Sequence, residues 1–108
     1  LGLRHVVPVM KEAGGVIINL AAAIDGHRKA GPALQAATHA LRMMSAAAAL
    51  ELGESGAKIR INCLEYVEEV GDAELARAVM MLADETSSFM TGSRLTLCGN
   101  QTRRGAAQ

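Results

Sequence analysis

Strand-like runs alternate with helical segments along this chain, and this alternation constrains the fold more than any other feature. The strand-like runs are Val16–Leu20, Lys58–Leu64 and Leu95–Cys98. The first is an uninterrupted apolar run behind a glycine pair, which is typical of a strand buried on both faces. Strands that alternate with helices predict a parallel sheet with right-handed crossovers. We therefore expect an α/β fold with a small parallel sheet of three strands.

Three helical segments accompany these strands. Residues 1–13 carry apolar side chains at helical spacing and end at Gly14-Gly15, where glycine allows the left-handed conformation of a helix C-terminus. Residues 33–52 form the longest periodic segment and are apolar around most of the circumference, so we expect burial on more than one side. Asp72 is placed to cap a third helix. The apolar stripe of that helix consists of Leu75, Ala78, Val79 and Leu82.

The alanine-rich segment 33–52 carries two adjacent apolar stripes. The first consists of Leu34, Ala37, Leu41, Met44 and Ala48, and the second of Ala33, Ala36, Ala40, Met43 and Ala47. In its first three turns only five polar side chains interrupt them: Gln35, Thr38, His39, Arg42 and Ser45. Because alanine permits close approach of a neighbouring backbone, we expect the sheet on one face of this helix and a partner helix on another.

Length, charge and cysteine content narrow the function classes. The 108 residues include eleven basic and eleven acidic side chains, one Phe, one Tyr and no Trp. Balanced charge and scarce aromatic rings argue against a nucleic-acid binder or an anionic-membrane binder. No apolar run approaches the roughly 18 residues that cross a bilayer. Two cysteines do not make a disulfide framework, so we expect a cytoplasmic protein, with one domain over residues 1–100 and a tail over 101–108.

Four strings carry a resemblance to a known family. They are Gly15–Leu20, residues 32–52, Ile59–Asn62, and the segment from Glu74 to Gly92. In this order they resemble the glycine-strand-Asn string, the Tyr-x-x-x-Lys helix, the Ile-Arg-Val-Asn strand and the closing helix with its Thr-Gly turn of classical short-chain dehydrogenases/reductases. The resemblance covers the C-terminal half of that family. It implies the C-terminal portion of a three-layer, Rossmann-like parallel sheet, with NAD or NADP as the family's cofactor.

The same resemblance implies a degenerate active site. The family's catalytic Ser falls at Ala22 or the neighbouring Ala21, its Tyr at Leu34 and its Lys at Thr38. Hydride transfer at a carbonyl needs a bound nicotinamide and a proton donor near the oxygen. Leu34 cannot transfer a proton, Thr38 carries no charge, and alanine supplies no hydroxyl. We therefore expect no family-type turnover by this chain.

The cofactor positions of the family are also altered. Its Gly-x-x-x-Gly-x-Gly loop, which holds the dinucleotide pyrophosphate, belongs to a first βα unit upstream of Leu1, and the pattern does not occur in this chain. The Pro-Gly that lies against the nicotinamide falls at Glu65-Tyr66. We expect no cofactor and no metal on this chain alone.

Two functions follow as hypotheses. The first is an inactive C-terminal half of an NAD(P)-dependent oxidoreductase, whose partner is a missing N-terminal half. The alternative is a non-enzymatic self-association module that uses helix 33–52, because in the family that helix packs against its copy in a second subunit.

The remaining candidates for catalytic or metal-binding residues are a tyrosine and three histidines that lie far apart in the sequence. Tyr66 follows a strand at the edge where α/β sheets bind ligands, but no lysine stands at helical spacing to lower its pKa, so a covering role is favoured. His27 and His39 match no common metal-ligand spacing, and we expect solvated histidines at both and at His5.

Three pairs of side chains complete the candidates. Cys63 and Cys98 each end a predicted strand, so a redox pair is the alternative to two reduced thiols. Lys58 and Arg60 are expected at a solvated strand end. Arg103-Arg104 is a charge pair in the tail.

Overall fold

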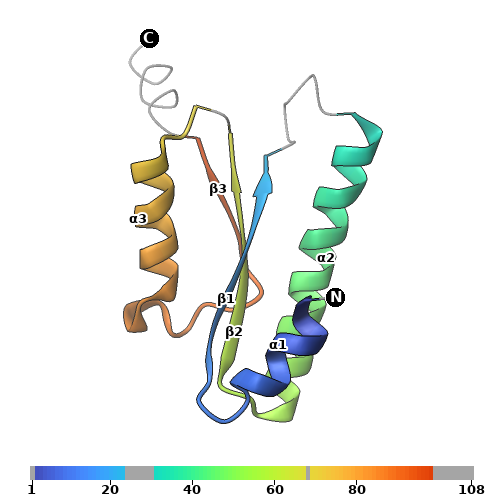
Figure 1. Cartoon of the computed structure of the whole chain (residues 1–108), viewed down its shortest axis with the longest axis vertical. Coiled ribbons are helices and arrows are strands. Elements are labelled where there is room, and N and C mark those ends of the chain that lie inside the picture. Colours follow the sequence, from blue (N-terminus) through green and yellow to red (C-terminus); the bar gives the residue numbers. More distant parts are fainter. Residues whose placement is uncertain (1, 24–30, 68, 99–108) are drawn as a thin grey trace.

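The computed structural model describes residues 2–23, 31–67 and 69–98 and confirms the α/β fold. Strands β1 and β2 run parallel, as do β2 and β3, in the order β1-β2-β3. Helices α1 and α2 lie on one face of the sheet and α3 on the other, which makes three layers (Figure 1). The elements are α1 (Gly2–Met10), β1 (Gly15–Ala22), α2 (Pro32–Ser55), β2 (Ile59–Tyr66), α3 (Asp72–Ala83), the 3-10 turn η1 (Glu85–Ser87) and β3 (Arg94–Leu97).

The turn from α1 into β1 depends on Gly14. Its N–H donates to the Met10 carbonyl at 2.7 Å, and its φ of 77° is a left-handed conformation. A Cβ at this position would come within 2.6 Å of the Lys58 carbonyl oxygen. Glycine is therefore required both for the turn and for the close approach of the two backbones.

The centre of the sheet is β2, which is buried on both faces. Its residues Ile61 to Glu65 are almost inaccessible to solvent. On one face Ile59 and Ile61 pack with Ala49 and Leu52 of α2. The expectation that Val16–Leu20 is buried on both faces is wrong, because β1 forms an edge of the sheet and its residues are half-buried or exposed.

Helix α2 departs from its expected burial. Its buried residues are Thr38, Ser45, Ala49 and Leu52, all on one side, so the expectation of burial on more than one side is wrong for this chain. A three-stranded sheet covers one face of the helix only. Thr38 and Ser45 both lie on the buried side, and β1 supplies a polar partner for Ser45: the Asn19 amide donates to its hydroxyl at 2.8 Å.

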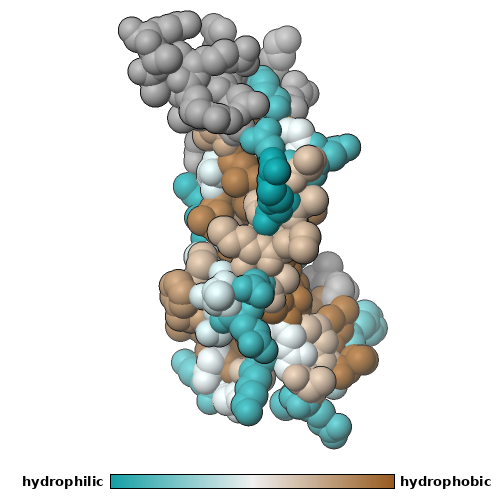
Figure 2. Space-filling model, turned by 90° about the vertical axis from the view of Figure 1, so that its left-hand side faces the viewer, coloured by the Kyte–Doolittle hydropathy of each residue, from teal (hydrophilic) through white to brown (hydrophobic). Residues whose placement is uncertain are grey.

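Helix α3 begins without the expected cap. Gly71 occupies the N-cap position, no side chain caps the helix, and Asp72 is the first helical residue, so the Asp72 cap is wrong. Its carboxylate still lies in the first turn, where the helix dipole favours negative charge. The predicted stripe does face the sheet, with Leu82 fully buried. The α3 side of the molecule shows hydrophobic and hydrophilic residues interspersed (Figure 2).

Arg60 ties the loop before β3 to the sheet instead of lying solvated, so that expectation is wrong. Its guanidinium donates to the carbonyls of Ser87, Met90 and Asp84, at 2.8, 3.3 and 3.3 Å. Lys58 is exposed as expected. Arg60 is half-buried because the three loop carbonyls need donors and lie over its strand.

Candidate functional site

The carboxyl ends of β1 and β2 meet at one edge of the sheet, and a hollow of about 270 Å³ opens there. Parallel α/β sheets bind ligands at this edge. The residues at the family's Ser, Tyr and Lys positions all line the hollow, although the chain separates them. The complete lining is Leu20, Ala21, Ala22, Leu34, Ala37, Thr38 and Leu41.

The chemistry of this hollow is almost purely apolar. Thr38 contributes the single polar side chain of the lining, and that residue is 2% exposed. A neutral hydroxyl without a neighbouring base does not transfer protons at neutral pH. The hollow therefore lies where parallel α/β sheets bind ligands, and its lining offers one hydroxyl and no ionisable side chain.

A buried ion pair lies beside the hollow. Both oxygens of Glu65 accept hydrogen bonds from Arg42 of α2: Nε donates to Oε2 at 2.5 Å and Nη2 to Oε1 at 2.7 Å. The Glu65 side chain is 1% exposed and that of Arg42 13%. This two-pronged geometry is the strongest form of carboxylate–guanidinium pairing. It connects α2 to the central strand and occupies both oxygens of the carboxylate.

Two further groups surround the pair. Arg94 Nε lies 3.9 Å from Glu65 Oε2, and His39 Nδ1 lies 3.4 Å from Arg42 Nη1. The family resemblance places Glu65 at a cofactor position and does not connect it with Arg42. A signal was present, because each is a charged residue in an otherwise apolar stretch of its strand or helix. Such isolated charges are buried only when they are paired.

Tyr66 and the histidines do not build a site. Tyr66 is the last residue of β2 instead of following the strand, and it is half-buried between Ala22 and Leu97 of the neighbouring strands. His39 and His5 are exposed, as expected, and His27 lies outside the described residues, as do most of the 24–32 loop and the tail. In the described ranges no three His, Cys, Asp or Glu side chains are grouped to hold a metal ion.

The two cysteines are not a redox pair. Cys63 lies in the middle of β2, not at its end, and is opposite Arg94 in register. Cys98 follows β3 and is exposed, four residues beyond that register position, or about 13 Å along the strand. A disulfide requires Cα atoms within about 7 Å. Burial raises the pKa of the Cys63 thiol, and the Glu65 carboxylate adds to the rise, while Arg42 and Arg94 oppose it.

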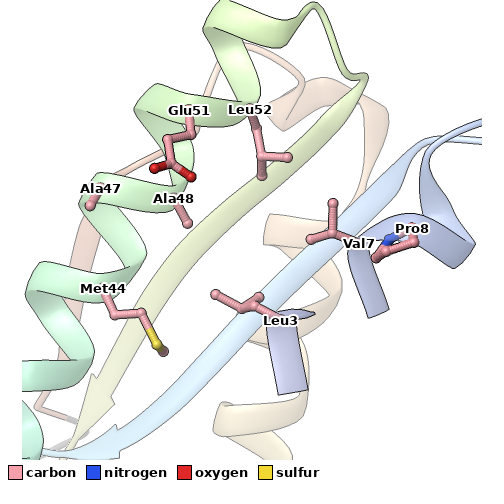
Figure 3. A pocket seen from close by; sticks show the side chains of 8 residues that line it. All are labelled: Leu3, Val7, Pro8, Met44, Ala47, Ala48, Glu51 and Leu52. Atoms are coloured by element: carbon pink, nitrogen blue, oxygen red, sulfur yellow. The ribbon is translucent and has the colours of Figure 1, made fainter. Parts of the chain in front are cut away.

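A second apolar hollow, of about 490 Å³, separates α1 from α2 (Figure 3). Leu3 and Val7 line it from α1, and Met44, Ala48 and Leu52 line it from α2. Glu51 is the charged residue of its lining. This hollow is distant from the carboxyl ends of the strands and contains no group suited to catalysis. None of the helices in the described part of the chain has both the length and the hydropathy of a membrane span.

A curated relative matches nearly the whole of this chain over about half of its own length. The trans-4-hydroxycyclohexanecarboxylate dehydrogenase of Sinomonas cyclohexanicum is 28% identical over 94% of this chain and 47% of its own length. The chain thus spans about half the length of this curated relative. No family model matches the sequence.

Solved structures with the same fold also match this chain over about half of their own length. A protein described as a short-chain dehydrogenase/reductase from Burkholderia xenovorans superposes with a TM-score of 0.75 at 24% identity, over 94% of this chain and 49% of that protein. A 4-hydroxyisoleucine dehydrogenase in complex with NADH gives a TM-score of 0.71 at 23% identity, over 89% of this chain and 51% of that protein. The resemblance to the C-terminal half of short-chain dehydrogenases/reductases is confirmed.

Proposed function

We propose that this chain, with the fold and sequence relationship of the C-terminal half of a short-chain dehydrogenase/reductase, does not transfer hydride. The observation that carries the proposal is the apolar hollow at the carboxyl ends of the strands. Ala22, Leu34 and Thr38 meet there, where the family resemblance expects Ser, Tyr and Lys. The fold brings these three positions together, but the side chains that occupy them cannot donate a proton to a carbonyl oxygen as the family's side chains do.

Neighbouring groups do not replace the missing proton donor. Glu65 is the nearest carboxylate along β2, but both of its oxygens accept hydrogen bonds from Arg42. Tyr66 is half-buried between Ala22 and Leu97 and is not among the residues that line the hollow. The lining thus supplies no carboxylate, imidazole, phenol or amine for acid–base chemistry.

The residues present also do not fit a nicotinamide cofactor. The sequence contains no Gly-x-x-x-Gly-x-Gly loop for the pyrophosphate. At the Pro-Gly position of the family stands Glu65, a buried carboxylate that is held by an arginine. A charged pair thus stands where the family has the small Pro-Gly surface against the nicotinamide.

The test restores the three side chains together. The variant Ala22→Ser, Leu34→Tyr, Thr38→Lys and the unmodified chain are each titrated with NADH and NADPH by calorimetry and assayed on simple ketones. We expect no binding at micromolar concentration and no consumption of NADPH by either. Oxidation of NADPH by the unmodified chain would overturn the proposal. Oxidation by the triple variant alone would show that a cofactor site survives and that the three side chains alone are missing.

A specific surface favours a second candidate, self-association through α2. One stripe of this helix is exposed and apolar, with spacings of three and four residues that are typical of helix–helix packing. Met43 and Leu50 on it are 74% and 70% exposed. The stripe consists of Ala33, Ala36, Ala40, Met43, Ala47 and Leu50. Burial of several hundred Å² of such surface favours association by several kcal/mol at roughly 25 cal/mol per Å².

A charge in the middle of this stripe tests the second candidate. We expect a dimer at about 10 μM, and a monomer for Ala40→Glu at that concentration because its carboxylate would lose water. Ala76→Glu on the exposed side of α3 is the matched control and should leave the dimer unchanged. Sedimentation of the unmodified chain as a monomer at about 100 μM would contradict this candidate.

The alternative partner is a polypeptide that carries the N-terminal half of the family fold. It is supported by the half-length match to the relatives. Two thiols too far apart for a disulfide also support a reducing, cytoplasmic location. Retention of the chain on a tagged N-terminal half of the Sinomonas relative, and not on the full-length relative, would support this partner.

A further inference from the structure

We propose that the hollow between α1 and α2 binds an alkylammonium ion, which is an organic amine that is protonated at neutral pH and carries a linear apolar chain. The hollow is distant from the carboxyl ends of the strands, so this inference does not rest on the absence of hydride transfer. One of its walls is α1 and the other is α2 (Figure 3).

The size and the lining of the hollow suit a small apolar ligand. Its volume of about 490 Å³ lies within the roughly 300–1,000 Å³ of typical small-molecule sites. Between Met44 and Leu52, α2 presents only the methyl groups of Ala47 and Ala48 towards this space (Figure 3). All lining residues except Glu51 are apolar; they are Leu3, Val7, Pro8, Met44, Ala47, Ala48 and Leu52.

The hollow is elongated along the two helices. Leu3 and Met44 lie at one end of it, and Leu52 lies at the other (Figure 3). Met44 and Leu52 are separated by two turns of α2, or about 12 Å along the helix axis. An extended chain of about eight carbons has a similar length. The shape therefore favours a linear apolar chain.

Glu51 supplies the charge that selects the head group of the ligand. It lies on the α2 wall, near Leu52, and is exposed at the rim of the hollow. Within residues 2–23, 31–67 and 69–98 the ion pairs involve Glu65 and not Glu51. A carboxylate at the rim of an apolar hollow is complementary to an ammonium group at the end of an apolar chain.

The position of Glu51 in the helix also favours a cation. Glu51 and Glu54 lie in the last two turns of α2, where the helix dipole disfavours negative charge. Basic side chains usually stand near a helix C-terminus, and the last turn of α2 has none. The two carboxylates thus do not stabilise the helix that carries them. A cation beside Glu51 would offset both the carboxylates and the negative end of the dipole.

Three probes of equal chain length separate the contributions of charge and chain. They are octylammonium, octan-1-ol and octanoate. We expect octylammonium to bind with a dissociation constant of about 1 mM. Octan-1-ol should bind about threefold more weakly, because an exposed ion pair contributes little. Octanoate should bind at least about tenfold more weakly than octylammonium, since Glu51 repels its carboxylate.

The titration is followed by NMR on the isotope-labelled full chain. It uses the Ala40→Glu variant, because Ala47 of the hollow also belongs to the α2 stripe and a dimer through that stripe would compete. We expect saturable shifts at the amides of Leu3, Val7 and Ala48. In that background Glu51→Gln should weaken octylammonium about threefold and leave octan-1-ol unchanged. Glu69→Gln removes the same charge from an exposed position outside the lining and should change neither.

A larger side chain inside the hollow supplies a second variant. Ala48→Leu should abolish binding of all three probes, whereas Ala46→Leu, at an exposed position of α2 outside the lining, should not. If Ala48→Leu fails to fold, the exposed Glu51→Gln exchange still tests the charge. Equal affinity for octylammonium and octanoate, shifts outside the lining, or no saturable shift would each overturn the proposal. None of these outcomes bears on hydride transfer or on the α2 dimer.

Discussion

Loss of the Arg42 side chain is expected to destabilise the fold strongly, because it leaves a buried carboxylate without its main partner. In Arg42→Met the Glu65 carboxylate stays buried at 1% exposure and loses both hydrogen-bond donors. Removal of one partner of a buried ion pair costs about 3–5 kcal/mol. Arg94 remains 3.9 Å from Glu65, and Arg42 itself is 13% exposed. We therefore expect the lower end, a loss of about 3 kcal/mol in the free energy of unfolding.

Removal of both charges distinguishes the cost of an unpaired buried carboxylate from the cost of lost packing. The double variant Arg42→Met, Glu65→Leu leaves no buried charge without its partner, since Arg94 is 44% exposed, and similar substitutions elsewhere are neutral or stabilising. We expect it to recover most of the stability lost in Arg42→Met. Arg77→Met, on the exposed side of α3, is the control and should change stability by less than about 0.5 kcal/mol.

Urea unfolding followed by circular dichroism at about 10 μM measures these differences. Equal loss in the single and double variants would refute the reasoning, because the cost would then come from lost packing of the arginine stem. A loss below about 0.5 kcal/mol in Arg42→Met would show that Arg94 and solvent compensate the carboxylate.

Further predictions concern three positions. Cys98 should react with a thiol reagent in the folded chain, whereas Cys63 should react only on unfolding, because it is buried and its pKa is raised; a thiol count against urea checks this. Asn62→Ala should lower stability by about 2–3 kcal/mol, since its amide anchors the loop before β3 through three hydrogen bonds; denaturant unfolding measures it. Asp84 accepts from Thr86, which lowers the Asp84 pKa, so its stabilisation should be present above about pH 3.9 and lost as the pH falls through the lowered value. Asp84→Asn should abolish that acid-dependent contribution in pH-resolved unfolding curves.

The sequence by itself determined the order of helices and strands and the parallel sheet. Apolar β-branched runs between helical periodicities have few alternative arrangements, and Gly14 marked the turn before β1. The residues at the family's catalytic positions were also predicted from the sequence. Their convergence in one hollow followed from the packing of the first turns of α2 against the carboxyl end of β1.

Tertiary structure alone decided which side of α2 is buried. Its apolar stripes suggested the inward face, yet Thr38 and Ser45 lie against the sheet. The reason is that the spacing of apolar residues describes the helix alone. Which of its faces is buried depends also on the surface that the helix packs against. Asn19 and Glu65 supply polar groups from the strands, and they bind Ser45 and Arg42 across distances of 26 and 23 residues. Such pairings join residues from different segments of the sequence, so they become apparent only in the folded chain.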